Sequence, residues 1–139
     1  MIEEDLKMRT KQFALRVIGL VNSLPRSQTG KVLGNQLLRS GTSVGANYRA
    51  ACRGRSTADF ISKLGVVAEE ADESLYWMEL ISESGLVVQN KLINLIQEAN
   101  ELTAIFTASI LTAKRNSHPN QKSNIKNPNS KFQNLKSKI

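Results

Sequence analysis

Several residue types are scarce in this chain of 139 residues, and each scarcity excludes a class of protein. Cys52 is the only cysteine, so no disulfide forms within the chain and a reducing cytoplasm is the expected location. His118 is the only histidine, and one Cys with one His falls short of the usual zinc ligand set. No apolar run approaches the ~18 residues of a membrane span. We therefore expect a soluble protein with no membrane segment, metal or cofactor.

Acidic residues are absent from Lys7 to Arg55, a stretch that holds ten basic residues. From Asp59 to Glu101, nine acidic residues stand against two lysines. The net charge of +7 arises from residues 114–139, which hold seven basic residues and no acid. Such separation either pairs the two halves internally or presents opposite potentials to partners.

Apolar residues recur at helical spacing in four segments, about 3–24, 29–53, 57–84 and 89–113, and nothing alternates with the period of a strand. Pro25, Gly54 and Gly85 mark the ends of the first three. Three short connections between helices of similar length predict an all-α, antiparallel up-and-down four-helix bundle over residues 1–113. Residues 114–139 are rich in Asn, Ser, Lys and Gln, lack apolar periodicity, and are expected to form a disordered basic tail.

The second segment has unusually small residues at its inward positions, which are Leu33, Leu37, Ser40, Val44, Asn47 and Ala51. Gly41 and Gly45 each cost a helix about 1 kcal/mol relative to Ala. A close approach to another helix, a partner subunit or a ligand would offset that loss. Asn47 would either fix the helix register with Ser40 or Ser74, or face a pore or ligand.

Two arginines of the second segment, Arg39 and Arg49, are candidates for ion pairs with the third. Glu69 and Glu73 share one helical face there. Either arginine reaching either carboxylate, across the bundle or across a subunit boundary, would satisfy both charges. The acidic residues of this segment could instead bind a divalent cation, but sign separation between packed helices favours ion pairing.

Nothing in the sequence supports catalysis. Ser40 and Ser43 have no histidine base within reach, and Gly30-Lys31 lacks the glycine spacing and the preceding strand of a phosphate-binding loop. The protein is therefore expected not to be an enzyme.

Five basic residues are candidates for nucleic-acid binding: Arg26, Lys31, Arg49, Arg53 and Arg55. If the second helix ends near residue 53, the last three gather at one end of the bundle. The alternative is that these arginines form salt bridges between subunits. The chain has no aromatic platform or groove-reading motif, so any binding would depend on shape and charge.

The segments Leu33–Arg49, Asp59–Leu64 and Glu69–Leu80 resemble the bacterial four-helix-bundle proteins encoded in intervening sequences of 23S ribosomal RNA genes. The resemblance covers roughly residues 8–113. It implies an up-and-down bundle that assembles into a ring-like homopentamer, with nucleic-acid association as the suggested role. The family is also similar in fold to the accessory protein of diversity-generating retroelements, a basic pentamer that binds nucleic acid and a reverse transcriptase.

Two functional hypotheses follow from the residues and the resemblance together. In the first, the protein is a non-enzymatic oligomer that binds RNA or DNA weakly and without sequence readout, and a ring repeats its basic cluster. In the second, it is a structural or protein-interaction scaffold, for example an adaptor for a reverse transcriptase or another neighbour-encoded protein, that does not bind nucleic acid itself.

Overall fold

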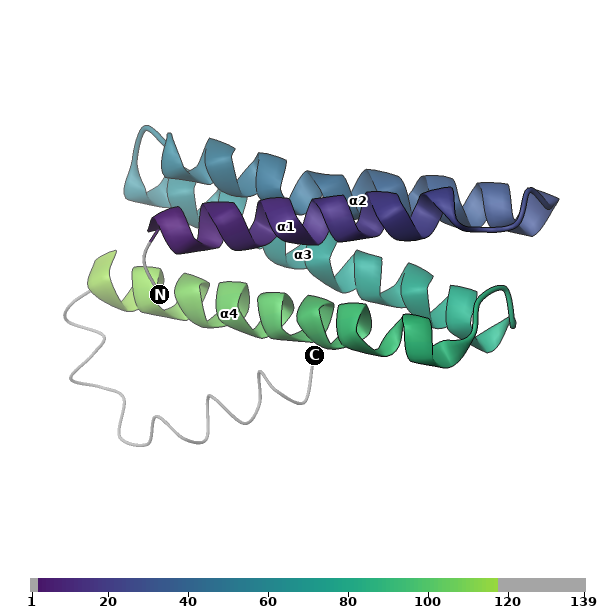
Figure 1. Cartoon of the computed structure of the whole chain (residues 1–139). Helices are drawn as coiled ribbons and strands as arrows, with labels where there is room; N and C mark the ends of the chain where they lie inside the picture. Colours follow the sequence, from purple (N-terminus) through teal and green to yellow (C-terminus); the bar gives the residue numbers. More distant parts are fainter. Residues whose placement is uncertain (1–2, 118–139) are drawn as a thin grey trace.

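The computed structural model describes residues 3–117, and these form four helices joined by short connections (Figure 1). The helices are α1 (Glu3–Asn22), α2 (Gln28–Cys52), α3 (Thr57–Glu83) and α4 (Ile93–Ser117), with a short 3-10 turn, η1 (Gln89–Lys91), before α4. Successive helices run antiparallel, and no strand occurs among these residues. The predicted all-α up-and-down bundle is confirmed. The predicted tail lies, from residue 118 onward, outside the described residues.

Serine side chains cap two of the helices. The Ser27 hydroxyl accepts a hydrogen bond from the Gly30 N–H at 3.0 Å, and the Ser56 hydroxyl accepts one from the Asp59 N–H at 3.1 Å. Each satisfies one of the backbone donors that a helix leaves free in its first turn. Helix α2 therefore begins at Gln28, one residue before the expected start at about residue 29.

The helix ends differ from expectation mainly around α4. The fourth segment does not begin as an α-helix at Gln89, because residues 89–91 form the 3-10 turn and Val88 supplies no side-chain cap. Helix α4 then runs to Ser117, four residues beyond the expected end at Ala113. Lys114 and Arg115 lie in this last turn, where positive charge interacts favourably with the helix dipole. Residues 114–117, the first residues of the expected tail, are thus helical.

A single apolar core runs between the helices, and all four contribute to it. Its largest fully buried apolar side chains are Phe13, Val17, Leu37, Val44, Leu64, Val67, Met78, Ile81, Leu92, Leu102 and Phe106. Within residues 3–117, every buried side-chain nitrogen and oxygen has a hydrogen-bond partner. The core therefore carries no unsatisfied polar group in this part of the chain.

The glycines of α2 allow α1 to approach closely. A Cβ atom added at Gly41 would lie 2.8 Å from both methyl groups of Val17, and one added at Gly45 would lie 3.1 Å from Thr10 Oγ1. The close approach expected from these glycines is therefore made to a helix of the same chain, α1.

The inward face of α2 is rotated relative to the predicted one. Ser40, Val44 and Ala51 are buried as expected, but Asn47 is only half-buried and its neighbour Tyr48 is buried instead. The Asn47 amide donates to the Ser43 carbonyl one turn back, at 2.8 Å, and not to Ser40 or Ser74. Asn47 therefore does not fix the register with either serine, and its pore- or ligand-facing role stays a prediction. The physical reason for the rotation is that α1 packs on the glycine side of α2, which turns Tyr48 inward.

The pairs of neighbouring helices differ in how extensively they pack on each other. Helix α2 packs extensively on α1 and α3, and α3 on α4, whereas α1 and α4 share the fewest contacts. A charged cluster bridges this last pair. Arg9 donates to Glu98 from Nε at 2.9 Å and from Nη2 at 2.7 Å, and Nη2 also contacts Glu101 at 2.9 Å. Sequence analysis does not predict this cluster.

Candidate nucleic-acid interface

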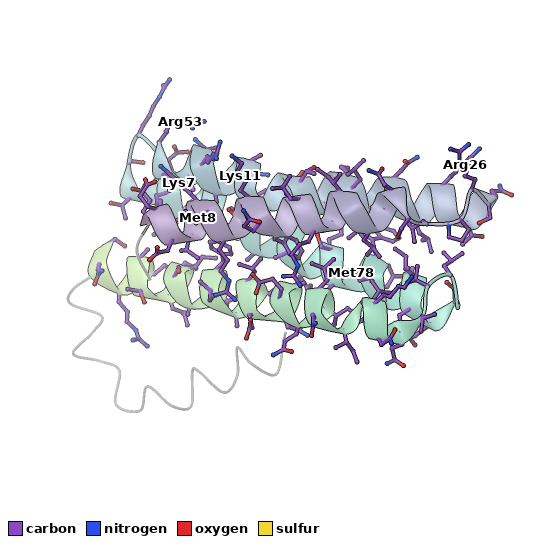
Figure 2. The ribbon with its side chains drawn as sticks, viewed as in Figure 1. Lys7, Met8, Lys11, Arg26, Arg53 and Met78 are labelled. Atoms are coloured by element: carbon purple, nitrogen blue, oxygen red, sulfur yellow. The ribbon has the colours of Figure 1, made fainter. Side chains whose placement is uncertain are left out.

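The five basic candidates divide between the two ends of the bundle. Arg26 lies in the α1–α2 connection and Lys31 in the first turns of α2, whereas Arg49, Arg53 and Arg55 lie at the other end of α2. Lys31 and Arg49 are separated by about 27 Å along the helix, at 1.5 Å per residue. Figure 2 shows Arg26 and Arg53 at opposite ends of the molecule. One short ligand therefore cannot contact all five.

Two lysines of α1 join the arginines at the second end. Lys7 and Lys11 lie alongside Arg49 and Arg53 because α1 packs antiparallel to α2 (Figure 2). Together the four cations line a surface hollow of about 550 Å³, whose other lining residues are Glu4, Met8 and Gln12. Sequence analysis did not single out Lys7 and Lys11. The signal in the sequence that could have identified Lys7 and Lys11 is their spacing of four residues, which equals that of Arg49 and Arg53.

A second hollow of about 210 Å³ continues the first along the same two helices. Lys7, Lys11 and Arg49 line both. Its remaining lining is small or neutral: Thr10, Ala14, Thr42, Gly45 and Ala46. We call the two hollows together the α1–α2 trough. Gly45 has no side chain, so the α1 backbone comes close to α2 at this point of the trough.

The cations of the trough are weakly compensated. Lys7 Nζ lies 3.5 Å from Glu4 Oε1, and Glu4 is itself exposed. Within residues 3–117, Lys11, Arg49 and Arg53 make no ion pair. The trough therefore presents a net positive potential to solvent, which attracts anions over a distance of about 10 Å at moderate salt.

Arg39, by contrast, is committed to α3. Its guanidinium pairs with Glu73 and, at 3.2 Å, with Glu70. Glu73 is one of the two expected partners. Glu69, the other, is exposed and makes no ion pair within residues 3–117, because Glu70 points toward α2 in its place. Arg49, the alternative arginine, faces the trough instead.

A buried polar contact lies directly beside this ion pair, because Ser40 follows Arg39 and Ser74 follows Glu73 in the sequence. The hydroxyls of Ser40 on α2 and Ser74 on α3 lie 3.0 Å apart, and both residues are buried. Each hydroxyl also lies within hydrogen-bond distance of a carbonyl of its own helix. The pair fixes the register of α2 against α3, the role that sequence analysis assigned to Asn47.

Two titratable side chains at the trough end of α2 face inward. Burial raises the pKa of the Tyr48 hydroxyl, whose ring packs on Phe106 of α4 with centroids 5.2 Å apart. Burial also raises the pKa of the Cys52 thiol. A raised pKa keeps the thiol protonated at neutral pH, and Cys52 packs as a small apolar group against the core.

No group of three or more His, Cys, Asp or Glu side chains among residues 3–117 is arranged to hold a metal ion. None of the helices in this range has both the length and the apolar character needed to cross a lipid bilayer. The α1–α2 trough, by contrast, carries four cationic side chains, Lys7, Lys11, Arg49 and Arg53. What it can bind is an anion.

Comparison with known proteins assigns the chain to a family. Residues 4–108 match the family model described as 23S rRNA-intervening sequence protein. Among solved structures, the chain is similar to a protein of unknown function from the S23 ribosomal protein family of Bacteroides thetaiotaomicron VPI-5482, with 34% sequence identity and a TM-score of 0.74. That match covers 79% of this chain and 98% of the other. No curated protein matches the chain significantly.

Proposed function

The chain belongs to the 23S rRNA-intervening sequence protein family, and from this premise and the α1–α2 trough we propose that it is a non-enzymatic protein that binds RNA or DNA without sequence readout. We propose further that it acts in the cytoplasm as a homo-oligomer, and the family resemblance favours a pentamer. The binding surface is the trough end of α1 and α2.

The observation that carries this proposal is the convergence of Lys7, Lys11, Arg49 and Arg53 from two helices on one hollow. A carboxylate contacts only Lys7 among these four within the described residues. Lysine and arginine side chains held on rigid helices are suited to phosphate contacts, which supply affinity and no sequence information.

The proposed oligomer is supported by opposite charges on opposite sides of the bundle. Helix α3 exposes four carboxylates that make no ion pair within residues 3–117, Glu69, Asp72, Glu79 and Glu83. Helices α1 and α2 expose the basic residues. A contact between the acidic face of one copy and the basic face of the next is heterologous, and such contacts close into rings when the rotation between copies permits.

The test uses the full chain with a labelled RNA and a labelled duplex DNA at low and at moderate salt. We expect binding to both at low salt, and a steep loss as salt rises because counterions are released. The variant Arg49→Glu/Arg53→Glu should abolish binding. Arg26→Glu/Lys31→Glu, with the same change in charge at the other end of α2, is the matched control and should still bind.

Native mass measurement of the same variants separates this function from the scaffold hypothesis. If the intact protein forms an oligomer and binds no nucleic acid at low salt, the proposal is wrong and the scaffold function takes its place. If Arg49→Glu/Arg53→Glu dissociates the oligomer, these arginines serve assembly through intersubunit salt bridges.

A further inference from the structure

We propose that the α1–α2 trough binds the backbone of a single strand, so that the protein prefers single-stranded over double-stranded nucleic acid. This inference rests on the proposed function and adds the form of its ligand. Four features of the trough support it: its length, the spacing of its cations, its width and the residues at its rim.

The trough is elongated along the helix axes. On α1 its lining extends from Glu4 to Ala14, and on α2 from Arg53 back to Thr42. At about 1.5 Å per residue, these stretches are about 15 Å long. The two hollows are continuous through Lys7, Lys11 and Arg49. A compact anion would fill one end of such a trough, whereas a linear polyanion uses its whole length.

The cations are spaced like the charges of a strand. Lys7 and Lys11 are four residues apart on α1, and Arg49 and Arg53 are four residues apart on α2. Four residues correspond to about 6 Å along a helix, a distance comparable to that between neighbouring phosphates of one strand. The two walls therefore present cations in step with successive phosphates, from both sides of the strand.

The width of the trough excludes a duplex. Packed helix axes lie only about 8–10 Å apart, and the inner hollow is lined by residues as small as Ala14, Gly45 and Ala46. A strand fits lengthwise between the two helices. A duplex is wider than this spacing, so only its outermost phosphates would reach the rim cations, and it would make fewer contacts.

The rim also offers an apolar contact for a base. Met8 is 67% exposed and lines the outer hollow beside Lys7 and Lys11 (Figure 2). Its thioether is flexible and polarizable, and such side chains pack readily against aromatic rings. The bases of a single strand are free to turn toward Met8, whereas those of a duplex are stacked and paired. This contact is therefore available only to the single strand.

The experiment measures binding of the full chain to a labelled 12-nucleotide oligo-U, the matching oligo-dU and a 12-base-pair duplex, each at several salt concentrations. We expect both single strands to bind at least tenfold more tightly than the duplex. Similar affinities for the two would show that the phosphodiester strand, and not the sugar, is recognised. A preference for either would show that the sugar contributes as well.

Two variants test the trough directly, and a third is the matched control for the first. Lys11→Gln/Arg49→Gln should weaken single-strand binding by about tenfold or more and reduce the log–log salt slope by about 1.4, at 0.7 per lost phosphate contact. Arg26→Gln/Lys31→Gln removes the same charge elsewhere and should change affinity by less than about twofold. Ala46→Leu fills the inner hollow at an exposed helix position without a change in charge, and should weaken single-strand binding while leaving duplex binding unchanged.

The outcomes separate the two proposals. Failure of every probe to bind at low salt would overturn both the proposed function and this inference. Equal binding of duplex and single strand, equal weakening by the two glutamine variants, or an Ala46→Leu variant with unchanged affinity would leave nucleic-acid binding in place and overturn the trough as a single-strand site. A change in native mass caused by Lys11→Gln/Arg49→Gln would also overturn it, because the cations would then act in assembly.

Discussion

Gly41 shows how one missing side chain sets the packing of two helices. The added Cβ would lie 2.8 Å from Val17, whose side chain is fully buried and, as a β-branched residue, stiff. The valine cannot rotate away within the core, so a methyl group there would push α1 from α2. The glycine is retained in the middle of a helix because the close approach compensates for its poor helix propensity.

We therefore expect Gly41→Ala to destabilise the protein by about 1–3 kcal/mol, the usual cost of overpacking a core. Gly65→Ala is the matched control, because Gly65 is also within a helix and nothing lies within 4 Å of its added Cβ. This control should stabilise the protein by about 0.5–1 kcal/mol. Urea unfolding of both variants gives the comparison, and a stabilised Gly41→Ala would contradict the proposed packing.

The hydroxyl pair between α2 and α3 should be energetically coupled. Ser40→Ala and Ser74→Ala each remove one hydroxyl, and the remaining one keeps a carbonyl partner in its own helix. We expect each to cost about 1 kcal/mol. The loss of unfolding free energy in the double variant should be smaller than the sum of the two single losses by about 0.5 kcal/mol, because residues in contact are energetically coupled.

A separate cycle provides the control for this coupling. Ser109 on α4 bonds to the Ile105 carbonyl of its own helix. Ser40→Ala combined with Ser109→Ala should therefore be additive when measured by the same unfolding experiment. Additive costs for Ser40 and Ser74 as well would show that their contact contributes nothing to stability.

Among the elements, α1 is held unequally by its neighbours. Its glycine-lined contact with α2 is apolar and close, whereas its contact with α4 depends on Arg9 and its two carboxylates. The hydrogen bond and charge of Arg9 hold the pKa of Glu98 below its ordinary value. The side chain of Glu98 is only 14% exposed, whereas that of Glu101 is 52% exposed. Glu98 is therefore the stronger anchor.

This anchor makes the stability of the protein dependent on pH. Because the pKa of Glu98 is lower in the folded state, its contribution is complete above the ordinary glutamate pKa of about 4.3 and is lost as pH falls through the folded-state value. We expect Glu98→Gln to cost about 1 kcal/mol at neutral pH. The difference from the unmodified protein should shrink toward zero near pH 3.

The measurement is the free energy of unfolding between about pH 3 and pH 7, where the linkage of protonation to folding appears as a slope. Glu101→Gln serves as control and should cost only a few tenths of a kcal/mol, because exposed ion pairs contribute little. A constant difference between the unmodified protein and Glu98→Gln at every pH would show that the ion pair with Arg9 is not the cause.

Across the whole molecule, the core of residues 3–117 is built from side chains that precede residue 111. Its buried side chains extend from Leu6 to Phe106, and the partly buried ones that pack on it end at Ile110. A chain ending at Ser117 should therefore unfold within about 2 °C of the full chain, since 1 kcal/mol corresponds to several degrees for a domain of this size. Thermal unfolding checks this. A much larger fall would mean that residues 118–139 contribute to the core.

The charges also divide across the whole molecule. The acid-free stretch becomes α2 and the part of α1 that follows its acidic first turn, and the acidic stretch becomes α3 and the first turns of α4. Arg39 and Arg9 each cross this division to a carboxylate of the other half. The exposed carboxylates of α3 and the exposed cations of the α1–α2 trough remain on the surface, which is why both an anionic ligand and a second copy are reasonable partners.

The amino-acid pattern alone is sufficient for the number of helices, their approximate ends, the bundle and the tight approach at Gly41 and Gly45. Helix formation depends on hydrogen bonds and side chains within a few residues, so periodicity and capping residues are enough to predict it. The exchange of Asn47 for Tyr48 in the core is the first point at which this local information fails, because it depends on how far α2 is rotated.

Which side chains meet across the bundle depends on the packed fold. Arg9 and Glu98 are 89 residues apart in the sequence. Lys7 and Arg49 line one trough only because α1 lies antiparallel to α2 at the short distance between helices that the glycines permit. Rotation and register between helices follow from the complete set of core contacts, which no single segment contains. The trough therefore appears only in the assembled bundle.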